Sequence, residues 1–233
     1  MSKLNGVTMT WLGHSTWLIQ SPKGKRILVD PWLDSNPACP DEYKGDGVGD
    51  VDVIICTHGH FDHIADAVAV AKRTGAPVVG IYELTSWMEG EGVESTVGGN
   101  KGGTMPVAGL KVTLVHALHS STFNDRDMGD PCGFVLEFEN GYKVYNAGDT
   151  DVFGDMALIA ELYEPDCVML PIGDWFTMGP KQAAKAIELL GATLVIPQHY
   201  GTFPVLTGTP SAVQERVGDG VEVVDIKPGD TIR

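Results

Sequence analysis

The segment Thr57–His63, with the sequence THGHFDH, places three histidines and one aspartate within a few positions of one another. It directly follows Val51–Cys56, a mostly apolar run that is typical of a buried strand. Imidazoles and a carboxylate at the end of a core strand lose hydration and therefore need polar partners. A divalent metal ion suits this set of nitrogen and oxygen donors. The pattern favours a metal site over a solvated polar loop.

Three further polar side chains follow strand-like runs later in the chain. His119 ends the run LKVTLVHALH, Asp149 ends YKVYNAGD and His199 ends TLVIPQH. The ends of strands in a rigid scaffold are places where side chains from distant segments can reach one common site. We therefore expect these three residues to complete the metal site that begins at the THGHFDH segment.

The spacing within THGHFDH divides the ligands between two ions. His58 and His60 share one pleat direction and can bind one ion. Asp62 and His63 turn with the start of the following helix and can bind a second ion. The expected ligands are His58, His60 and His119 for the first ion, Asp62, His63 and His199 for the second, and Asp149 as a bridge between both.

Two cations that share a hydroxide lower the pKa of water and stabilise a developing oxyanion. The pattern therefore predicts hydrolysis of an ester-like, lactone, amide or phosphoester substrate by a metal-bound hydroxide. Asp62 is expected to orient the attacking hydroxide as well as to bind metal. Imidazole and carboxylate ligands suit zinc, which we expect, and also manganese, iron or nickel.

Strand patterns and helix patterns succeed one another in a similar order in both halves of the chain. Hairpin-like strands come first, and alternating strands and helices follow. This order is satisfied by two sheets packed face to face with helices outside, an α+β arrangement. Strands are expected within 6–13, 15–21, 26–31, 51–58, 76–82, 110–120, 132–150, 167–173, 193–199 and 221–226, and helices within 65–75, 83–92, 155–163 and 180–191, with a last helix before the final strand.

Several motifs resemble those of the metallo-β-lactamase superfamily. THGHFDH is similar to its H-x-H-x-D-H motif, and HSS at His119, AGDT at Asp149 and PQHYGTFP at His199 fit its later ligand positions in order. The opening TWLGHSTWLI and ILVDPWL resemble more narrowly its uncharacterised metal-dependent hydrolase branch. That branch lies near the ascorbate-phosphate lactonases and, more remotely, the N-acylphosphatidylethanolamine phospholipases.

The resemblance spans essentially the whole chain. It implies a single domain over residues 1–233 with a four-layer αβ/βα sandwich and a dinuclear metal site at one edge, between the sheets. It also implies a small-molecule substrate, although fold and metal site are shared by many chemistries. Members of the branch are often oligomeric, and aromatic residues such as Trp87 look exposed, so we expect a homo-oligomer.

Other residues near the motifs have two interpretations each. The third histidine of the first ion is His119 or His116, and the serines that follow His119 favour it. His14 is either a structural hydrogen-bonding residue or one that contacts substrate or a metal ligand. Asp30 is either a turn residue or an acceptor of hydrogen bonds from the metal loop, which would orient ligands.

The polar segment 120–133 is expected at the rim of the site or on the open surface. If it forms a lid, Phe123, Asn124 and Arg126 are candidates for substrate contact. Trp32 and Trp175 are expected as packing or turn residues.

Composition excludes some classes of function. The chain has 233 residues and a formal net charge of −15, which disfavours a nucleic-acid partner because phosphate contact needs clustered lysine and arginine. Its four cysteines form no CxxC pair and are expected as reduced structural thiols. Without a signal-peptide stretch or a long apolar run, the chain is expected to be cytoplasmic, with no membrane contact.

Three alternatives to the hydrolase differ in what they require. A redox role at a di-iron centre shared with a flavin would need a further domain, for which 233 residues leave no room. An RNA-processing nuclease of the same superfamily would need a basic surface. A non-catalytic protein that binds metal or a ligand would need no complete ligand set, and the set here looks complete.

Overall fold

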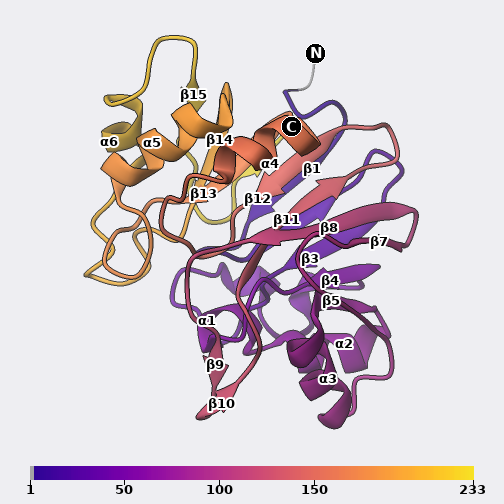
Figure 1. Cartoon of the computed structure of the whole chain (residues 1–233). Helices are drawn as coiled ribbons and strands as arrows, with labels where there is room; N and C mark the ends of the chain where they lie inside the picture. The colour runs from indigo at the N-terminus through magenta and orange to yellow at the C-terminus, as the bar shows by residue number, and fades with distance from the viewer. Residues whose placement is uncertain (1–2) are drawn as a thin grey trace.

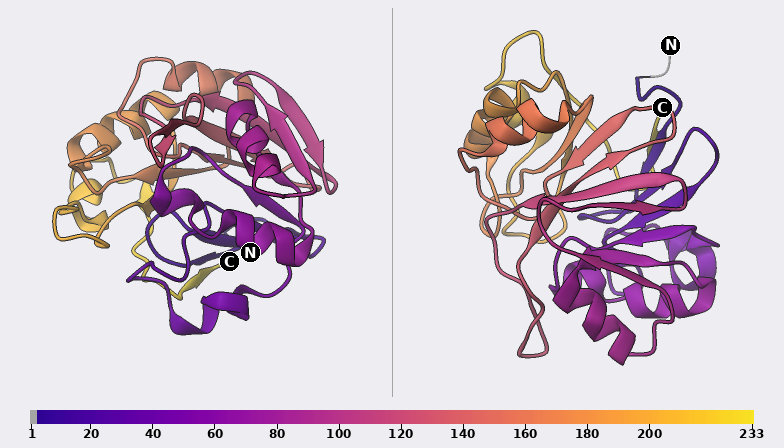
Figure 2. Two further views of the ribbon diagram at one scale, coloured as in Figure 1. Left: turned by 90° about the horizontal axis from the view of Figure 1, so that it is seen from below. Right: turned by 45° about the vertical axis from the view of Figure 1, so that its right-hand side comes forward.

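Two seven-stranded sheets stack face to face, and helices cover both outer surfaces (Figure 1). The structure is a computed structural model that describes residues 3–233, so Met1 and Ser2 of the expected domain lie outside the described residues. The layers are helix, sheet, sheet, helix, as two further views show (Figure 2). The expected αβ/βα sandwich is confirmed.

The first sheet has the strand order β16-β1-β2-β3-β4-β5-β6. Its strands are β1 (Thr8–Trp11), β2 (Trp17–Gln20), β3 (Arg26–Val29), β4 (Val53–Ile55), β5 (Val78–Ile81), β6 (Thr96–Gly99) and β16 (Thr231–Ile232). The first three are antiparallel neighbours, and β3 to β6 run parallel. The helices of this half are α1 (Phe61–Ile64), α2 (Ala67–Thr74) and α3 (Tyr82–Gly90), with short 3-10 turns η1 (Asp41–Tyr43) and η2 (Gly45–Val48).

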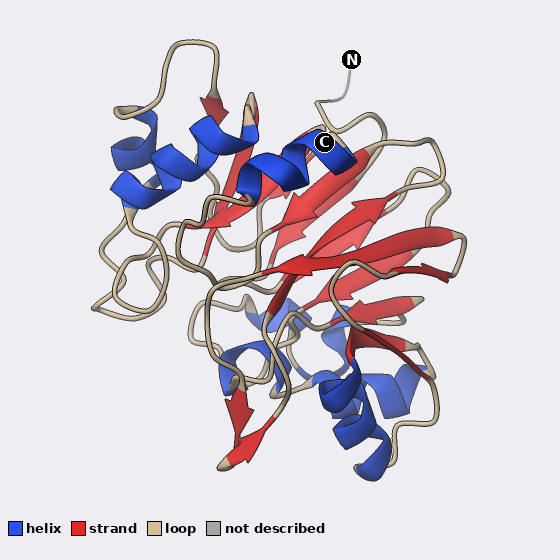
Figure 3. Ribbon diagram, viewed as in Figure 1, coloured by secondary structure: helices blue, strands red, loops and turns tan. Residues whose placement is uncertain are grey.

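The second sheet has the strand order β15-β14-β13-β12-β11-β8-β7. Its strands are β7 (Thr104–Val107), β8 (Leu110–His116), β11 (Cys132–Glu137), β12 (Lys143–Asn146), β13 (Cys167–Pro171), β14 (Leu194–Gln198) and β15 (Glu222–Val223). Helices α4 (Met156–Tyr163), α5 (Pro180–Leu190) and α6 (Pro210–Gln214) belong to this half. A small hairpin of β9 (Thr122–Phe123) and β10 (Arg126–Asp127) projects from the sandwich (Figure 3).

Side chains that point alternately to the two faces of each strand fill three apolar layers. In β3, Ile27 and Val29 face the layer between the sheets, whereas Leu28 faces the helices of the first half. In β8, Leu114 enters the central layer and Val115 enters the layer beneath α4 and α5. This period of two is the geometry of a pleated strand with both faces buried. It fixes which strand ends can project toward a site.

The strands that carry the candidate ligands end at one edge of the sandwich. Strands β1, β3 and β4 run in the same direction within the first sheet. Strands β8, β12 and β14 run in the same direction within the second, because β11 is antiparallel to β8 and β12. The segments that follow these six strands carry His14, Asp30, the THGHFDH motif, His119, Asp149 and His199. The loops at this edge can therefore form one site.

Strands β6, β7, β9, β10 and β16 lie outside the predicted strand ranges, and β6 and β7 each have a physical reason in their packing. Strand β6 ends in Gly98 and Gly99, which lower strand propensity. A side chain at Gly98 would approach Oγ1 of Thr85 on α3 to 2.5 Å, so close packing of helix on sheet requires glycine there. Strand β7 contains Pro106, which a sheet tolerates at its edge, and β7 pairs only with β8 among the described strands.

Candidate metal centre

The first group of candidate ligands lies where β4 and β8 give way to loops. Nε2 of His58 lies 2.9 Å from Nδ1 of His60, and Nε2 of His119 lies 3.3 Å from the same nitrogen. Each of the three residues offers a nitrogen within 4.8 Å of the others. The structure thus brings together the three histidines that the sequence assigned to one ion.

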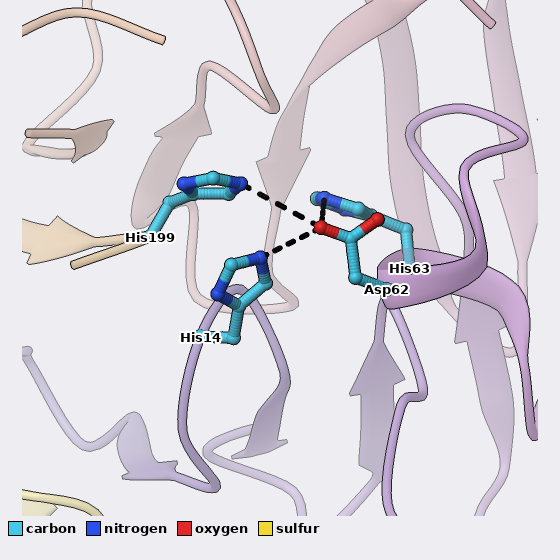
Figure 4. Close-up of side chains that lie close together, drawn as sticks. All are labelled: His14, Asp62, His63 and His199. Atoms are coloured by element: carbon cyan, nitrogen blue, oxygen red, sulfur yellow. Dashed lines mark hydrogen bonds and ion pairs between the residues drawn. The ribbon is translucent and has the colours of Figure 1, made fainter. Parts of the chain in front are cut away.

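The second group surrounds the carboxylate of Asp62, at the start of α1 (Figure 4). Its Oδ2 lies 3.8 Å from Nε2 of His199 and 3.9 Å from Nε2 of His63. The same oxygen also lies 2.9 Å from Nε2 of His14. His14 therefore joins the three residues that the sequence assigned to the second ion.

Asp149 lies between the two groups and is almost completely buried. Its Oδ2 is 3.0 Å from Nε2 of His199 and 3.2 Å from Nε2 of His63. The same oxygen is 3.7 Å from Nε2 of His119 and 3.9 Å from Nε2 of His58. One carboxylate thus reaches side chains of both groups, which is the place that a bridging ligand needs.

Polar atoms in this cluster are buried without a hydrogen-bonding partner among the described residues. They are Nε2 of His63 and Oδ1 of Asp149; Nδ1 of His199 also lacks a partner, but it lies on the other side of its ring from Nε2, the nitrogen that approaches Asp149. Such atoms are costly to bury, and a group of them indicates an ion or water as the missing partner. Imidazole nitrogens and carboxylate oxygens fit a divalent cation such as zinc. The residues present therefore fit the group that the motif implies.

The electrostatics of the cluster favour cations. Burial alone would raise the pKa of Asp149, but the charges of His199 and His63 hold it well below its usual range, so this carboxylate stays ionised. Burial lowers the pKa of His58, which leaves a neutral imidazole with a free lone pair. For His199, burial would lower the pKa, yet the charge of Asp149 raises it to about 9. The field of Asp149 thus attracts positive charge to the centre.

Asp30, directly after β3, accepts hydrogen bonds from the THGHFDH segment. Its Oδ1 accepts a hydrogen bond from the amide of Thr57 at 2.8 Å. Its Oδ2 accepts from Oγ1 of Thr57 at 2.7 Å and lies 2.8 Å from Nδ1 of His63. When Nδ1 of His63 donates to Asp30, a neutral ring keeps its lone pair on Nε2, toward the centre. The prediction that Asp30 accepts hydrogen bonds from this loop is confirmed.

Comparison with known proteins places the chain in a family. The family described as a Beta-lactamase superfamily domain matches residues 25–200. A UPF0173 metal-dependent hydrolase of Roseiflexus sp. is 51% identical over 97% of this chain and 96% of that protein. This chain belongs to the UPF0173 metal-dependent hydrolases. The resemblance drawn from its motifs is confirmed.

Two further similarities extend over nearly the whole chain. A UPF0173 metal-dependent hydrolase of Methanopyrus kandleri is 46% identical over 96% of this chain and 98% of the relative. The solved structure of a metallo hydrolase from the archaeon Ignicoccus hospitalis is 35% identical, with a TM-score of 0.88 and coverage of 97% of both chains. The fold described above is therefore that of solved metallo hydrolases.

His14 of this UPF0173 hydrolase supports the centre from the turn between β1 and β2. Its side chain is fully buried, with Nε2 at 2.9 Å from Asp62 and Nδ1 at 3.1 Å from Oγ1 of Thr202. Its backbone oxygen accepts a hydrogen bond from the amide of His199 at 3.0 Å. This burial argues against a direct contact of His14 with substrate, and its contact with a candidate ligand is confirmed.

Strained backbone surrounds the centre of the hydrolase. His14, Asp30 and His199 are not glycines, yet their φ angles are 57°, 44° and 54°. The left-handed region costs such residues of order 1 kcal/mol each and persists only where surrounding contacts enforce it. No local sequence pattern marks these conformations, which is why the sequence left the role of His14 open.

The loop after β8 corrects one expectation. The strand ends at His116, so His119 lies three residues beyond it instead of ending it. His116 is exposed and packs on Phe153, with ring centroids 4.8 Å apart, whereas His119 lies in the cluster. The loop after β8 therefore separates the two histidines.

The segment 120–133 of the hydrolase is anchored and is not a free lid. Oγ of Ser121 accepts a hydrogen bond from the amide of Gly59 at 3.0 Å. Phe123, a lid candidate, packs on Trp87 at 5.3 Å instead of entering the site, which leaves Trp87 partly buried. The other lid candidates, Asn124 and Arg126, lie on the projecting hairpin and do not line the pocket above the centre.

We expect His14→Ala to lower kcat/KM of the hydrolase by about 10- to 100-fold, as is typical when a partner of a ligand is lost. Asp62 would lose the hydrogen bond that fixes its carboxylate, although His14 itself is shielded from substrate. Steady-state kinetics with metal analysis would test this. His116→Ala is the matched control, because His116 is exposed outside the cluster. Equal rates for the two variants would contradict the assigned role of His14.

Proposed function

We propose that the protein hydrolyses a small molecule at a dinuclear centre of divalent cations. The convergence of buried, unpartnered donor atoms around Asp149 carries this proposal. The proposed ligands are His58, His60 and His119 for one ion, Asp62, His63 and His199 for the other, and Asp149 for both. Zinc is the proposed ion, with manganese, iron or nickel as alternatives.

Divalent cations at this place would supply Lewis acidity, which lowers the pKa of water and polarises the scissile bond of an ester-like, lactone or phosphoester substrate. Asp62 is the carboxylate best placed to orient the attacking water. Its side chain is 13% exposed and lines the pocket, whereas that of Asp149 is 2% exposed. The bond to His14 would hold the Asp62 carboxylate in one orientation.

The proposal also covers partners and place of action. A small molecule fits the family, and the net charge of −15 argues against nucleic acid. We propose one domain over residues 1–233, self-association into a homo-oligomer and action in the cytoplasm. No helix within residues 3–233 has the length and hydropathy needed to cross a membrane. The four cysteines are free and buried, as expected.

Metal analysis tests the proposal directly. We expect close to two ions per chain, and removal by chelator should lower hydrolysis of lactones, thioesters or phosphodiesters by about 100-fold or more. Added zinc or manganese should restore the rate, while circular dichroism confirms that the sheets persist. Protein prepared without chelator that contains no metal and takes up none on titration would refute the dinuclear centre.

A further inference from the structure

A pocket of about 520 Å³ opens over the candidate centre, a size that suits a small-molecule ligand. The polar part of its lining is formed by His60, Asp62, His119, Ser120, Asp149 and His199. The remaining lining is an apolar wall, defined here as Phe61, Phe176, Phe203 and Val205. A pocket of equal volume beside α5 offers none of the candidate ligands.

The apolar wall is unusually open to solvent. Phe61 and Phe176 are each 53% exposed, and Val205 is 38% exposed. Single exposed apolar residues are ordinary, but a contiguous set beside a polar floor indicates a binding surface. The wall therefore needs a partner, and its concave shape and continuity with the centre favour a small molecule.

The buried ring of Trp32 packs against two members of the apolar wall. Its ring lies 5.6 Å from that of Phe61 and 5.7 Å from that of Phe203. Phe203 also contacts the ring of His14 at 5.4 Å. Since Trp32 and His14 are buried, two members of the wall are held in place before any ligand arrives.

A strained loop after β13 presents Phe176. Asp174 and Trp175, just before it, have left-handed φ angles of 72° and 65°. The amide of Asp174 donates to the carbonyl of Met178, and the amide of Met178 donates to the carbonyl of Thr150. The loop is thus closed by its own backbone while the Phe176 ring stays at the pocket. Trp175 is a turn residue, as expected.

Outside the candidate ligands, the pocket has no cationic side chain for a second anionic group. Among the described residues, no lysine or arginine lines it, and Ser120 is its only polar member that is not a candidate ligand. An anionic group on the substrate beyond the scissile group would meet aromatic rings, which offer it no partner for the hydration it loses.

We propose that the substrate carries an uncharged, apolar group that lies against the wall of Phe61, Phe176, Phe203 and Val205 while the scissile bond faces the centre. This inference rests on the hydrolytic function proposed above, and it narrows that function. It selects neutral apolar esters or lactones over substrates with a distant carboxylate or phosphate.

A series of 4-nitrophenyl esters tests the proposal. The acetate, the butyrate and the hemisuccinate share one leaving group, and the last two differ mainly by a distant carboxylate. Each methylene that reaches the wall should raise kcat/KM about threefold to fourfold, so butyrate should exceed acetate by about tenfold. Hemisuccinate should be no better than acetate. Equal kcat/KM for butyrate and hemisuccinate would overturn the proposal.

Phe176→Ala should reduce the preference for butyrate over acetate to about threefold or less, with unchanged metal content. Leu162→Ala is the matched control, because Leu162 is 69% exposed on α4, outside the pocket. It should keep the full preference. The same loss in both variants would overturn the proposal. Sedimentation tests a third case, in which the wall binds a second copy of the chain. If Phe176→Ala abolished self-association, the wall would be a contact between copies, and the proposal of an apolar substrate group would be overturned.

A binding measurement keeps this inference separate from the proposed hydrolysis. The uncharged ketone 4-phenylbutan-2-one cannot be hydrolysed, and ligand-observed NMR reports its binding to the metal-loaded protein. Binding to the wild type and to Leu162→Ala, but not to Phe176→Ala, would support the apolar site even if no ester were turned over. Equal binding to all three proteins, or to none, would overturn it.

Discussion

Asp149→Asn is expected to leave the chain folded and to lower hydrolysis by about a thousandfold or more, because metal-assisted chemistry contributes several kcal/mol. Oδ2 of Asp149 lies within 3.9 Å of histidine nitrogens from both ligand groups. A neutral amide keeps the size of the side chain but removes the negative charge that would lie between the two proposed dications. Metal content should fall from about two ions toward one, which elemental analysis would measure.

Asp151→Asn is the matched control for this variant. It makes the same chemical change two positions along the chain, at a side chain that is exposed outside the ligand groups. Its rate and metal content should equal those of the wild type. A folded Asp149→Asn protein that retained two ions and full activity would show that Asp149 is not the bridge.

Asp30→Asn should weaken both metal affinity and stability. Asp30 is not a proposed metal ligand but accepts hydrogen bonds from the Thr57 amide, the Thr57 hydroxyl and Nδ1 of His63. In the asparagine, an NH2 group replaces one carboxylate oxygen, so a donor faces other donors. This costs about 1–3 kcal/mol of stability in a buried site. Metal affinity should fall about 10- to 100-fold, because the His63 ring loses its orienting partner. Thermal melting and metal titration measure the two effects.

Asp52→Asn is the control that separates the loss of metal affinity from the loss of stability. Asp52 accepts the amide of Arg26 at 2.9 Å and the ammonium of Lys25 at 2.7 Å, at the opposite end of β3 from Asp30. Its replacement should lower the melting temperature slightly and leave metal affinity unchanged. If Asp30→Asn binds metal as tightly as Asp52→Asn does, the orienting role of Asp30 is wrong.

The core of the site could be predicted because its chemistry is local. His58, His60, Asp62 and His63 are close in sequence, and a buried strand precedes them, so both their proximity and their need for a partner follow from the pattern. The sandwich followed from the order of strand and helix patterns. Two of the missed strands, β6 and β7, carry glycine or proline for reasons of tertiary packing and edge position, which local propensity does not capture.

The rest depends on contacts that only the folded chain creates. His14 contacts Asp62, which is far along the sequence, and its backbone adopts a left-handed conformation that the neighbouring residues do not predict. Phe61, Phe176 and Phe203 come from three separate loops, and their common feature is the pocket that they line. The projecting hairpin was expected as a loop because its strands have two residues each.

The position of the centre between the two sheets affects how the chain is held together. On the proposed ligands, the second ion would join Asp62 to His199, roughly 140 residues apart, and closing so long a loop restricts the unfolded chain strongly. Secreted proteins often obtain such long-range cross-links from disulfides, but all four cysteines here are free and buried. A bound pair of ions would therefore tie the first half of the chain to the second without requiring an oxidising environment.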